Sequence, residues 1–337
     1  MTPDSTPPWL TGARPAWYQE VREWLTGIRS ADLGPVARIT TVKERPWSVV
    51  LRVTFEKAAA YFKACGAGGS HEPGLLLHLQ GDWNRSIPDL LTVDTARGWT
   101  LMADAGRPLR EAFDVPGQIA MLRRLLPAYA ELQAATMQAI EPLLHLGLPD
   151  RRLDRLPDLL EELIAGEALA ELRGSVRSLL PALEQCCIEL ARSPYSAALD
   201  HGDLHPGNVL VHRDDYRFCD WGDSCITHPF VSMGVTFEMV LSQIPAADRV
   251  EHARQLRDAY LGPWTPYGSP ESLRVDFLRA LWVADVVRAL DFARMFAGGD
   301  EESRARWQPL IAKRLEEWVK RTPPPGPSQA QDDGGRG

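Results

Sequence analysis

The most informative stretch of the chain lies near its middle and reads His201-Gly202-Asp203-Leu204-His205-Pro206-Gly207-Asn208. An apolar run, 209–211, follows at once, and after a polar turn comes Asp220-Trp221-Gly222-Asp223. A single Asp or Asn in a loop is usually a turn or capping residue. Three polar residues in this order, with Asn208 five positions after Asp203, indicate a site instead.

The segment after Asn208 predicts a hairpin, because residues 209–211 and 216–219 have strand character on either side of a polar turn. A hairpin returns the chain to its start, so Asn208 and Asp220 are expected side by side. Their oxygens suit Mg²⁺, which keeps several waters. In the similar loop of kinases, an Asp orients the substrate hydroxyl while the Asn and the later Asp hold Mg²⁺. We therefore predict a phosphotransferase with Asp203 as the catalytic residue and Asn208 and Asp220 as metal ligands.

Bulk composition narrows the class of protein. With 337 residues, 45% of them hydrophobic, the chain suits two domains or one bilobal enzyme. A formal net charge of −8 and the lack of a basic run argue against a nucleic-acid partner. Five scattered cysteines, an N-terminus unlike a signal peptide and the lack of an apolar membrane-spanning window predict a cytoplasmic protein with no membrane partner.

Two regions of different character follow one another along the chain. Residues 1–34 are a Pro-rich start and an expected helix at 17–28, and residues 35–105 are strand-rich. The expected strands are 36–42, 48–54, 60–65, 90–94 and 98–102.

Residues 106–321 carry helical periodicity, and 322–337 is a low-complexity segment expected to be disordered. The long expected helices are 117–143, 156–191, 246–260 and 271–296. The predicted fold class is α+β and bilobal, protein-kinase-like, with a small β-rich N-lobe and a larger, mostly helical C-lobe that carries the catalytic loop.

Lys63 is the candidate for the nucleotide side. It lies inside the third expected strand, where a charge must be paired or solvated. Kinase folds place a Lys there that reaches the nucleotide phosphates and pairs with a Glu of the next helix. Glu72 is the first acidic residue after it, and Pro73 requires that Glu72 lie near a helix start. A solvated edge-strand lysine is the ordinary alternative.

The phosphate loop and the base-binding segment are less distinct. No Gly-x-Gly-x-x-Gly precedes Lys63, and the turn 44–48, with its Ser48 hydroxyl, is the only candidate between the first two strands; a plain hairpin turn explains it equally well. Ala103, Asp104 and Ala105 lie where the small lobe passes to the large one, and by position their backbone is expected to read an adenine edge.

The residues 201–210 and 220–223 resemble the aminoglycoside phosphotransferase and choline kinase enzyme family, which has the protein-kinase-like fold. The resemblance implies ATP- and Mg²⁺-dependent phosphorylation of a hydroxyl on a small molecule, such as an aminoglycoside, an amino alcohol or a sugar-like compound. Members often carry an Asp in a stretch similar to 228–232. Ser232 stands here, so an internal tie to the catalytic loop is expected to be missing.

Two other functions remain open at this stage. One is a catalytically silent, kinase-like nucleotide-binding protein, and the other is a metal-dependent phosphoester hydrolase suggested by the Asp203-x-His205 pair. The identity of the acceptor is also open. Four acidic residues after the loop would either attract a cationic sugar or amine or form a solvated helix face: Glu238, Asp276, Asp285 and Asp291.

Overall fold

The computed structural model describes residues 6–213 and 215–324, and these form two compact units. The first, here called the sheet unit, consists of the described residues within Met1–Ala112, Gly207–Asp223 and Ala293–Gln308. The second, the helical unit, consists of the described residues within Phe113–Pro206, Ser224–Phe292 and Pro309–Gly337. Most of the expected disordered tail, 322–337, lies outside the described residues.

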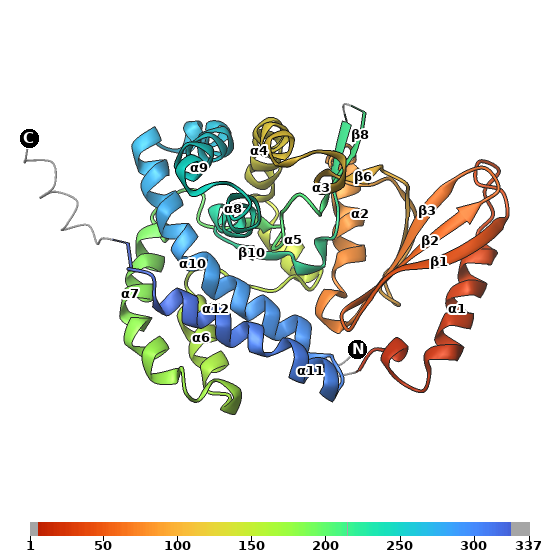
Figure 1. Ribbon diagram of the computed structural model, residues 1–337, viewed down its shortest axis with the longest axis horizontal. Helices are drawn as coiled ribbons and strands as arrows, with labels where there is room; N and C mark the ends of the chain where they lie inside the picture. Colours follow the sequence, from red (N-terminus) through yellow and green to blue (C-terminus); the bar gives the residue numbers. More distant parts are fainter. Residues whose placement is uncertain (1–5, 214, 325–337) are drawn as a thin grey trace, which may run out of the picture. The chain divides into compact units, whose positions relative to one another are not determined.

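A five-stranded antiparallel sheet of order β1-β2-β3-β5-β4 forms the centre of the sheet unit (Figure 1). All five strands expected from the sequence are confirmed: β1 Val36–Arg45, β2 Ser48–Phe55, β3 Ala59–Cys65, β4 Leu90–Asp94 and β5 Trp99–Ala103.

Helix α1 (Arg14–Gly27) covers one face of this sheet. Its Trp24 contacts Phe62 of β3 and Trp99 of β5, with ring centroids 5.8 and 5.7 Å apart. Trp17, which is also in α1, packs on Trp99 as well. Burial of such aromatic surface is the main force holding α1 to the strands.

The remaining parts of the sheet unit flank the sheet. The expected hairpin is present as β8 and β9, in a three-stranded sheet of order β6-β8-β9. The bounds are α2 Glu72–Asp82, β6 Arg107–Pro108, α3 Leu109–Ala112, β8 Val209–His212, β9 Asp215–Phe218 and α11 Glu301–Trp307, with 3₁₀ turns η1 Pro8–Leu10, η2 Ala67–Gly69 and η4 Trp221–Asp223.

The helical unit is built around α4 and α10. Tyr129 of α4 stacks on Tyr260 of α9, and Trp282 of α10 packs on Trp318 of α12. The bounds are α4 Val115–Thr136, α5 Ile140–His145, α6 Leu156–Ile164, α7 Arg173–Ala191, α8 Met233–Leu241, α9 Ala246–Leu261, α10 Pro270–Ala297 and α12 Pro309–Val319, with β7 Ala198–Asp200, β10 Cys225–Thr227 and the 3₁₀ turns η3 Glu167–Leu169, η5 Pro229–Ser232 and η6 Gly262–Tyr267.

Two expected long helices are each divided in the structure. The range 117–143 corresponds to α4 and α5, and 156–191 corresponds to α6 and α7. At the second break, Arg173 caps the end of α6: its guanidinium donates to the carbonyls of Ile164 and Ala165 at 2.8 and 2.9 Å. These carbonyls are left without partners where α6 ends, and a distant side chain satisfies them. In the described residues, no helix has the length and apolarity that would let it cross a membrane.

Candidate functional site

A buried ion-pair cluster forms the centre of the candidate site in the sheet unit. The Nζ of Lys63, on β3, lies 2.5 Å from Oε2 of Glu72 and also pairs with Oδ1 of Asp220. Burial by itself would lower the pKa of Lys63, but the Asp220 and Glu72 carboxylates outweigh it and hold that pKa well above its usual value. Lys63 is therefore a charged lysine inside the fold, not a solvated edge residue.

Glu72 begins α2, as the sequence required. Pro73 occupies the first turn of that helix, where a missing N–H costs nothing. Oε1 of Glu72 accepts a hydrogen bond from the backbone N–H of Trp221 at 2.9 Å. One carboxylate thus joins the lysine of β3 to the segment that carries Asp220.

Asp220 has an unusual backbone, with φ of 65°, in the left-handed region that non-glycine residues seldom adopt. The indole N–H of Trp221 donates to the Phe218 carbonyl at 3.0 Å, and its backbone N–H is held by Glu72. Such held, strained residues concentrate at functional sites. The two hydrogen bonds of Trp221 hold the backbone next to Asp220 in this conformation.

Asn208 and Asp220 stand at the two ends of the β8–β9 hairpin. The N–H of Cys219 donates to the Asn208 carbonyl at 2.9 Å, which closes the hairpin at this end. Asn208 is 8% exposed, and the Asp220 side chain is 36% exposed. A carboxylate and an amide with neighbouring lysines fit Mg²⁺ and phosphate oxygens, because Mg²⁺ takes few protein ligands. The described residues contain no group of three or more His, Cys, Asp or Glu that could hold a metal ion.

The segment expected to read a base follows β5. A cavity of about 150 Å³ is lined by Ala103, Asp104 and Ala105 on one side and by residues of the β8–β9 hairpin on the other. The N–H of Gly106 donates to Oδ1 of Asp104 at 3.1 Å. Gly106 has φ of 104°, and a Cβ there would lie 2.2 Å from the Val211 carbonyl oxygen, so only glycine fits.

Asp203 lies in the helical unit, where Arg288 of α10 holds it. One guanidinium nitrogen lies 2.7 Å from Oδ1 of Asp203, and the other donates to the Gly202 carbonyl at 2.9 Å. Nε2 of His205 is 3.5 Å from the other carboxylate oxygen. Arg288 was not predicted, because it is far from the loop in sequence and resembles any other helix arginine.

A buried network of hydrogen bonds holds the start of the loop 201–208. Asp200 accepts hydrogen bonds from the N–H of Gly202, at 3.1 Å, and from the Ser232 hydroxyl. The Tyr129 hydroxyl lies 2.7 Å from that of Ser232 and accepts the N–H of His201 at 3.0 Å. The expectation of a missing tie is therefore wrong, because Ser232 reaches the loop through Asp200. Burial raises the pKa of Asp200 to about 6, despite these hydrogen bonds.

A cavity of about 290 Å³ adjoins this loop within the helical unit. Gly202, Ser232 and Arg288 form part of its lining, together with apolar side chains of α8 and α10. Three of the four acidic candidates, Glu238, Asp285 and Asp291, also line it.

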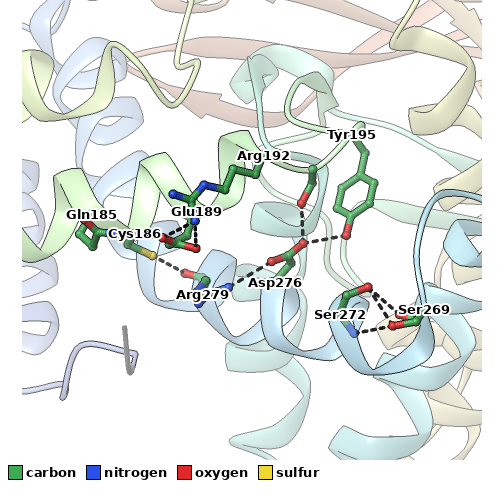
Figure 2. A network of polar contacts seen from close by, with 10 residues as sticks. Gln185, Cys186, Glu189, Arg192, Tyr195, Ser269, Ser272, Asp276 and Arg279 are labelled. Carbon is green, nitrogen blue, oxygen red and sulfur yellow. Dashed lines mark hydrogen bonds and ion pairs between the residues drawn. The ribbon is translucent and has the colours of Figure 1, made fainter. Parts of the chain in front are cut away.

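The fourth candidate, Asp276, is a structural residue (Figure 2). Its carboxylate accepts hydrogen bonds from the hydroxyls of Tyr195, at 2.8 Å, and Ser193, at 2.5 Å. Arg279 lies 3.4 Å from its other oxygen. Asp276 thereby joins α10 to the segment after α7 and does not line the cavity of the helical unit.

The acidic residues of the cavity are engaged by arginines. Arg314 of α12 lies 2.8 Å from Glu238 and 3.1 Å from Asp285, and Arg321 lies 2.7 Å from Asp285. Asp291 is 3.8 Å from Arg151. Neither expectation for these carboxylates, an open anionic patch or a solvated face, describes them fully. They are part of a cavity in which opposite charges are nearly balanced.

Comparison with known proteins identifies the family of this chain. Its sequence matches the phosphotransferase enzyme family over residues 86–274, more than half of the chain. No curated protein matches it significantly by sequence.

Several solved structures resemble it. The GDP and kanamycin complex of APH(2″)-IIIa has a TM-score of 0.58 and 18% identity, covering 90% of this chain and 98% of that one. An ethanolamine kinase of Plasmodium vivax has a TM-score of 0.60 and 12% identity, covering 83% and 82%. Choline kinase LicA from Streptococcus pneumoniae has a TM-score of 0.55 and 13% sequence identity, and the match covers 90% of this chain and 99% of that one. These likenesses confirm the kinase-like fold, and the chain belongs to the phosphotransferase enzyme family.

Proposed function

We propose that this protein transfers the γ-phosphate of ATP, with Mg²⁺, to a hydroxyl group of a small molecule. The observation that carries the proposal is the buried pair of Lys63 and Glu72, extended by the partly exposed Asp220, which joins a strand, a helix and the segment proposed to bind the metal. An ion cluster of this kind is costly to bury and adds little stability. It is expected where phosphates and a metal ion must be positioned.

Each residue has a distinct proposed part in the reaction. Asn208 and Asp220 hold Mg²⁺, which when bound neutralises charge on the phosphates. Lys63 contacts the nucleotide phosphates, and the backbone of Ala103, Asp104 and Ala105 contacts the base. Asp203 accepts the proton of the acceptor hydroxyl. Arg288 holds the Asp203 carboxylate with one guanidinium nitrogen and the Gly202 carbonyl with the other.

The acceptor is proposed to bind in the 290 Å³ cavity beside Gly202. This volume is at the lower end of the range for small-molecule sites, about 300–1,000 Å³. Because Glu238 and Asp285 are already paired with Arg314, a polycation would have to displace an arginine to reach them. The cavity therefore favours a compact acceptor with few charges, such as an amino alcohol, over a large polycationic aminoglycoside.

The roles of the two aspartates separate in one experiment. Parent, Asp203→Asn and Asp220→Ala proteins are titrated calorimetrically with MgATP, and turnover is measured on acceptors found by an ATP-consumption screen. Asp220→Ala is expected to lose MgATP binding and turnover. Asp203→Asn is expected to bind MgATP normally and to turn over about 10²- to 10⁴-fold more slowly, the usual contribution of a positioned base.

Asp154→Asn, at an exposed position of the helical unit, is the matched control and should behave as the parent does. Full activity of Asp203→Asn, or unchanged MgATP binding by Asp220→Ala, would refute the proposed roles. A parent protein that binds MgATP but phosphorylates nothing in a broad panel would support the silent nucleotide-binding alternative.

A further inference from the structure

The pairing of β1 with β2 is irregular near the turn that joins the two strands. Thr41 is opposite Leu51, but Lys43 is opposite Val50, so the register shifts by one residue between Thr41 and Lys43. Successive residues of a strand point to opposite faces of the sheet. A bulge with one extra residue therefore transfers every later side chain of β1 to the other face.

The bulge places Lys43 in line with Lys63. Val50 of β2 is opposite Lys43 on one side and opposite Lys63 of β3 on the other. Residues directly opposite one another in a sheet share a face, so the two lysines project from the same face with one residue between them.

Glu44 gives an independent check of this orientation. It accepts hydrogen bonds from the Tyr18 hydroxyl at 2.6 Å and from Arg14 at 2.9 Å, and both belong to α1. Helix α1 covers the face opposite to Lys63, so Glu44 points away from Lys43 as alternation requires. Without the bulge the two would be exchanged, and a carboxylate would face Asp220.

The side chain of Lys43 reaches the carboxylate that Lys63 also contacts. Its Nζ lies 3.8 Å from Oδ2 of Asp220, while Lys63 pairs with Oδ1. Lys63 is buried, whereas the Lys43 side chain is 42% exposed. Lys43 is thus a partly exposed cation beside a proposed metal ligand, and it lies two residues before the end of β1.

We propose that Lys43 binds the outer phosphates of the nucleotide. The inference rests on the proposed function, since it concerns the same nucleotide site. It accounts for the absence of a glycine-rich phosphate loop before Lys63: a lysine ammonium, aimed by the bulge, supplies attraction that such a loop supplies through backbone N–H groups. The chemical group recognised is the β- and γ-phosphate pair, because Asp220, the proposed ligand of their Mg²⁺, is the residue that Lys43 reaches.

The test is a set of calorimetric titrations of Lys43→Met, Lys43→Arg and the parent with MgATP and with AMP. Lys43→Met should bind MgATP on the order of tenfold more weakly, the effect of losing one charge-assisted contact in a partly solvated site. Its affinity for AMP should equal that of the parent, and Lys43→Arg should recover most of the MgATP affinity. Lys57→Met, which removes an exposed lysine that bonds the Ala31 carbonyl elsewhere in the sheet unit, is the matched control.

Two results would overturn the inference while leaving the proposed function intact. One is MgATP affinity in Lys43→Met equal to that of the parent, and the other is an equal loss for MgATP and AMP, which would place the effect away from the outer phosphates. Failure of the parent itself to bind MgATP would overturn the proposed function, and this inference with it.

Discussion

The Nζ of Lys63 lies 2.5 Å from Oε2 of Glu72, and the two side chains are only 5% and 1% exposed. Charges so far from water are stable only when paired, and here the pair is extended by Asp220. The pair is therefore expected to affect both the stability of the fold and the binding of MgATP, and each effect can be measured.

Lys63→Met is expected to lower the stability of the fold and to abolish most MgATP binding. It leaves Glu72 buried without its cation, a change that typically costs about 3–5 kcal/mol. The double variant Lys63→Met/Glu72→Leu should recover part of this stability but not MgATP binding, because no charge is then left unpaired between the two positions, while the Trp221 N–H loses its acceptor. Denaturant unfolding and calorimetry measure the two effects. Normal MgATP binding by the double variant would show that the pair is purely structural.

Asp200 is expected to govern turnover by positioning the loop. Asp200→Ser removes the acceptor of the Gly202 N–H, and a displaced catalytic group can slow turnover by about 10²-fold. The nucleotide KM should stay near that of the parent. Since Ser232 donates to Asp200, exchange of the two groups in Asp200→Ser/Ser232→Asp should restore part of kcat.

Amide exchange over residues 198–208 reports on the same variants without any substrate. It should rise in Asp200→Ser and fall again in the exchanged double variant. Unchanged exchange in the single variant would mean that the network does not hold the loop.

Acid is expected to destabilise both units through buried histidines. Burial lowers the pKa of His71 and of His228 to about 3, so both are neutral in the fold and take up protons on unfolding. Their stabilisation is complete above about pH 6.5 and is lost as the pH falls toward 3, at up to about 1.4 kcal/mol per pH unit for each. Asp200 acts in the opposite sense between about pH 4 and 6, because its pKa is raised.

Unfolding free energies of the parent and of His228→Asn, measured from pH 7 to 4, isolate one of these contributions. The Asn side chain retains an acceptor for the Phe230 N–H, which His228 accepts at 3.3 Å. The loss of stability on acidification should be smaller in the variant. Parallel curves would show that His228 does not titrate on unfolding.

Arg314→Met is expected to change which acceptors the protein prefers. Without this arginine, Glu238 loses the ion pair with Arg314, and Asp285 keeps only its ion pair with Arg321. The cavity therefore becomes more negative. The KM for a cationic acceptor should fall several-fold relative to a neutral one, the size of effect expected of one partly screened charge. Arg177→Met, which breaks an exposed pair with Glu161 in the same unit, is the control. An equal change for both acceptors would place the cavity outside the acceptor site.

The sequence was sufficient for features in which chemistry and spacing are local. Alternating strands, the hairpin after Asn208 and the position of Glu72 at a helix start all follow from neighbouring residues, and the structure has each of them. The division of 156–191 into two helices was missed, because the arginine that caps α6 acts from the next helix.

Only the tertiary structure decided which charges face which surface. In the sequence Lys43 and Glu44 are equivalent neighbours, and a single extra residue in the β1–β2 pairing decides which of them lies beside Asp220. Asp203 was evident from its loop, but Arg288 and the Asp200–Ser232 pair that hold this loop come from distant segments. The physical reason is the same in both cases: local pattern determines the type of each element, whereas strand register and long-range pairing determine where its charges point.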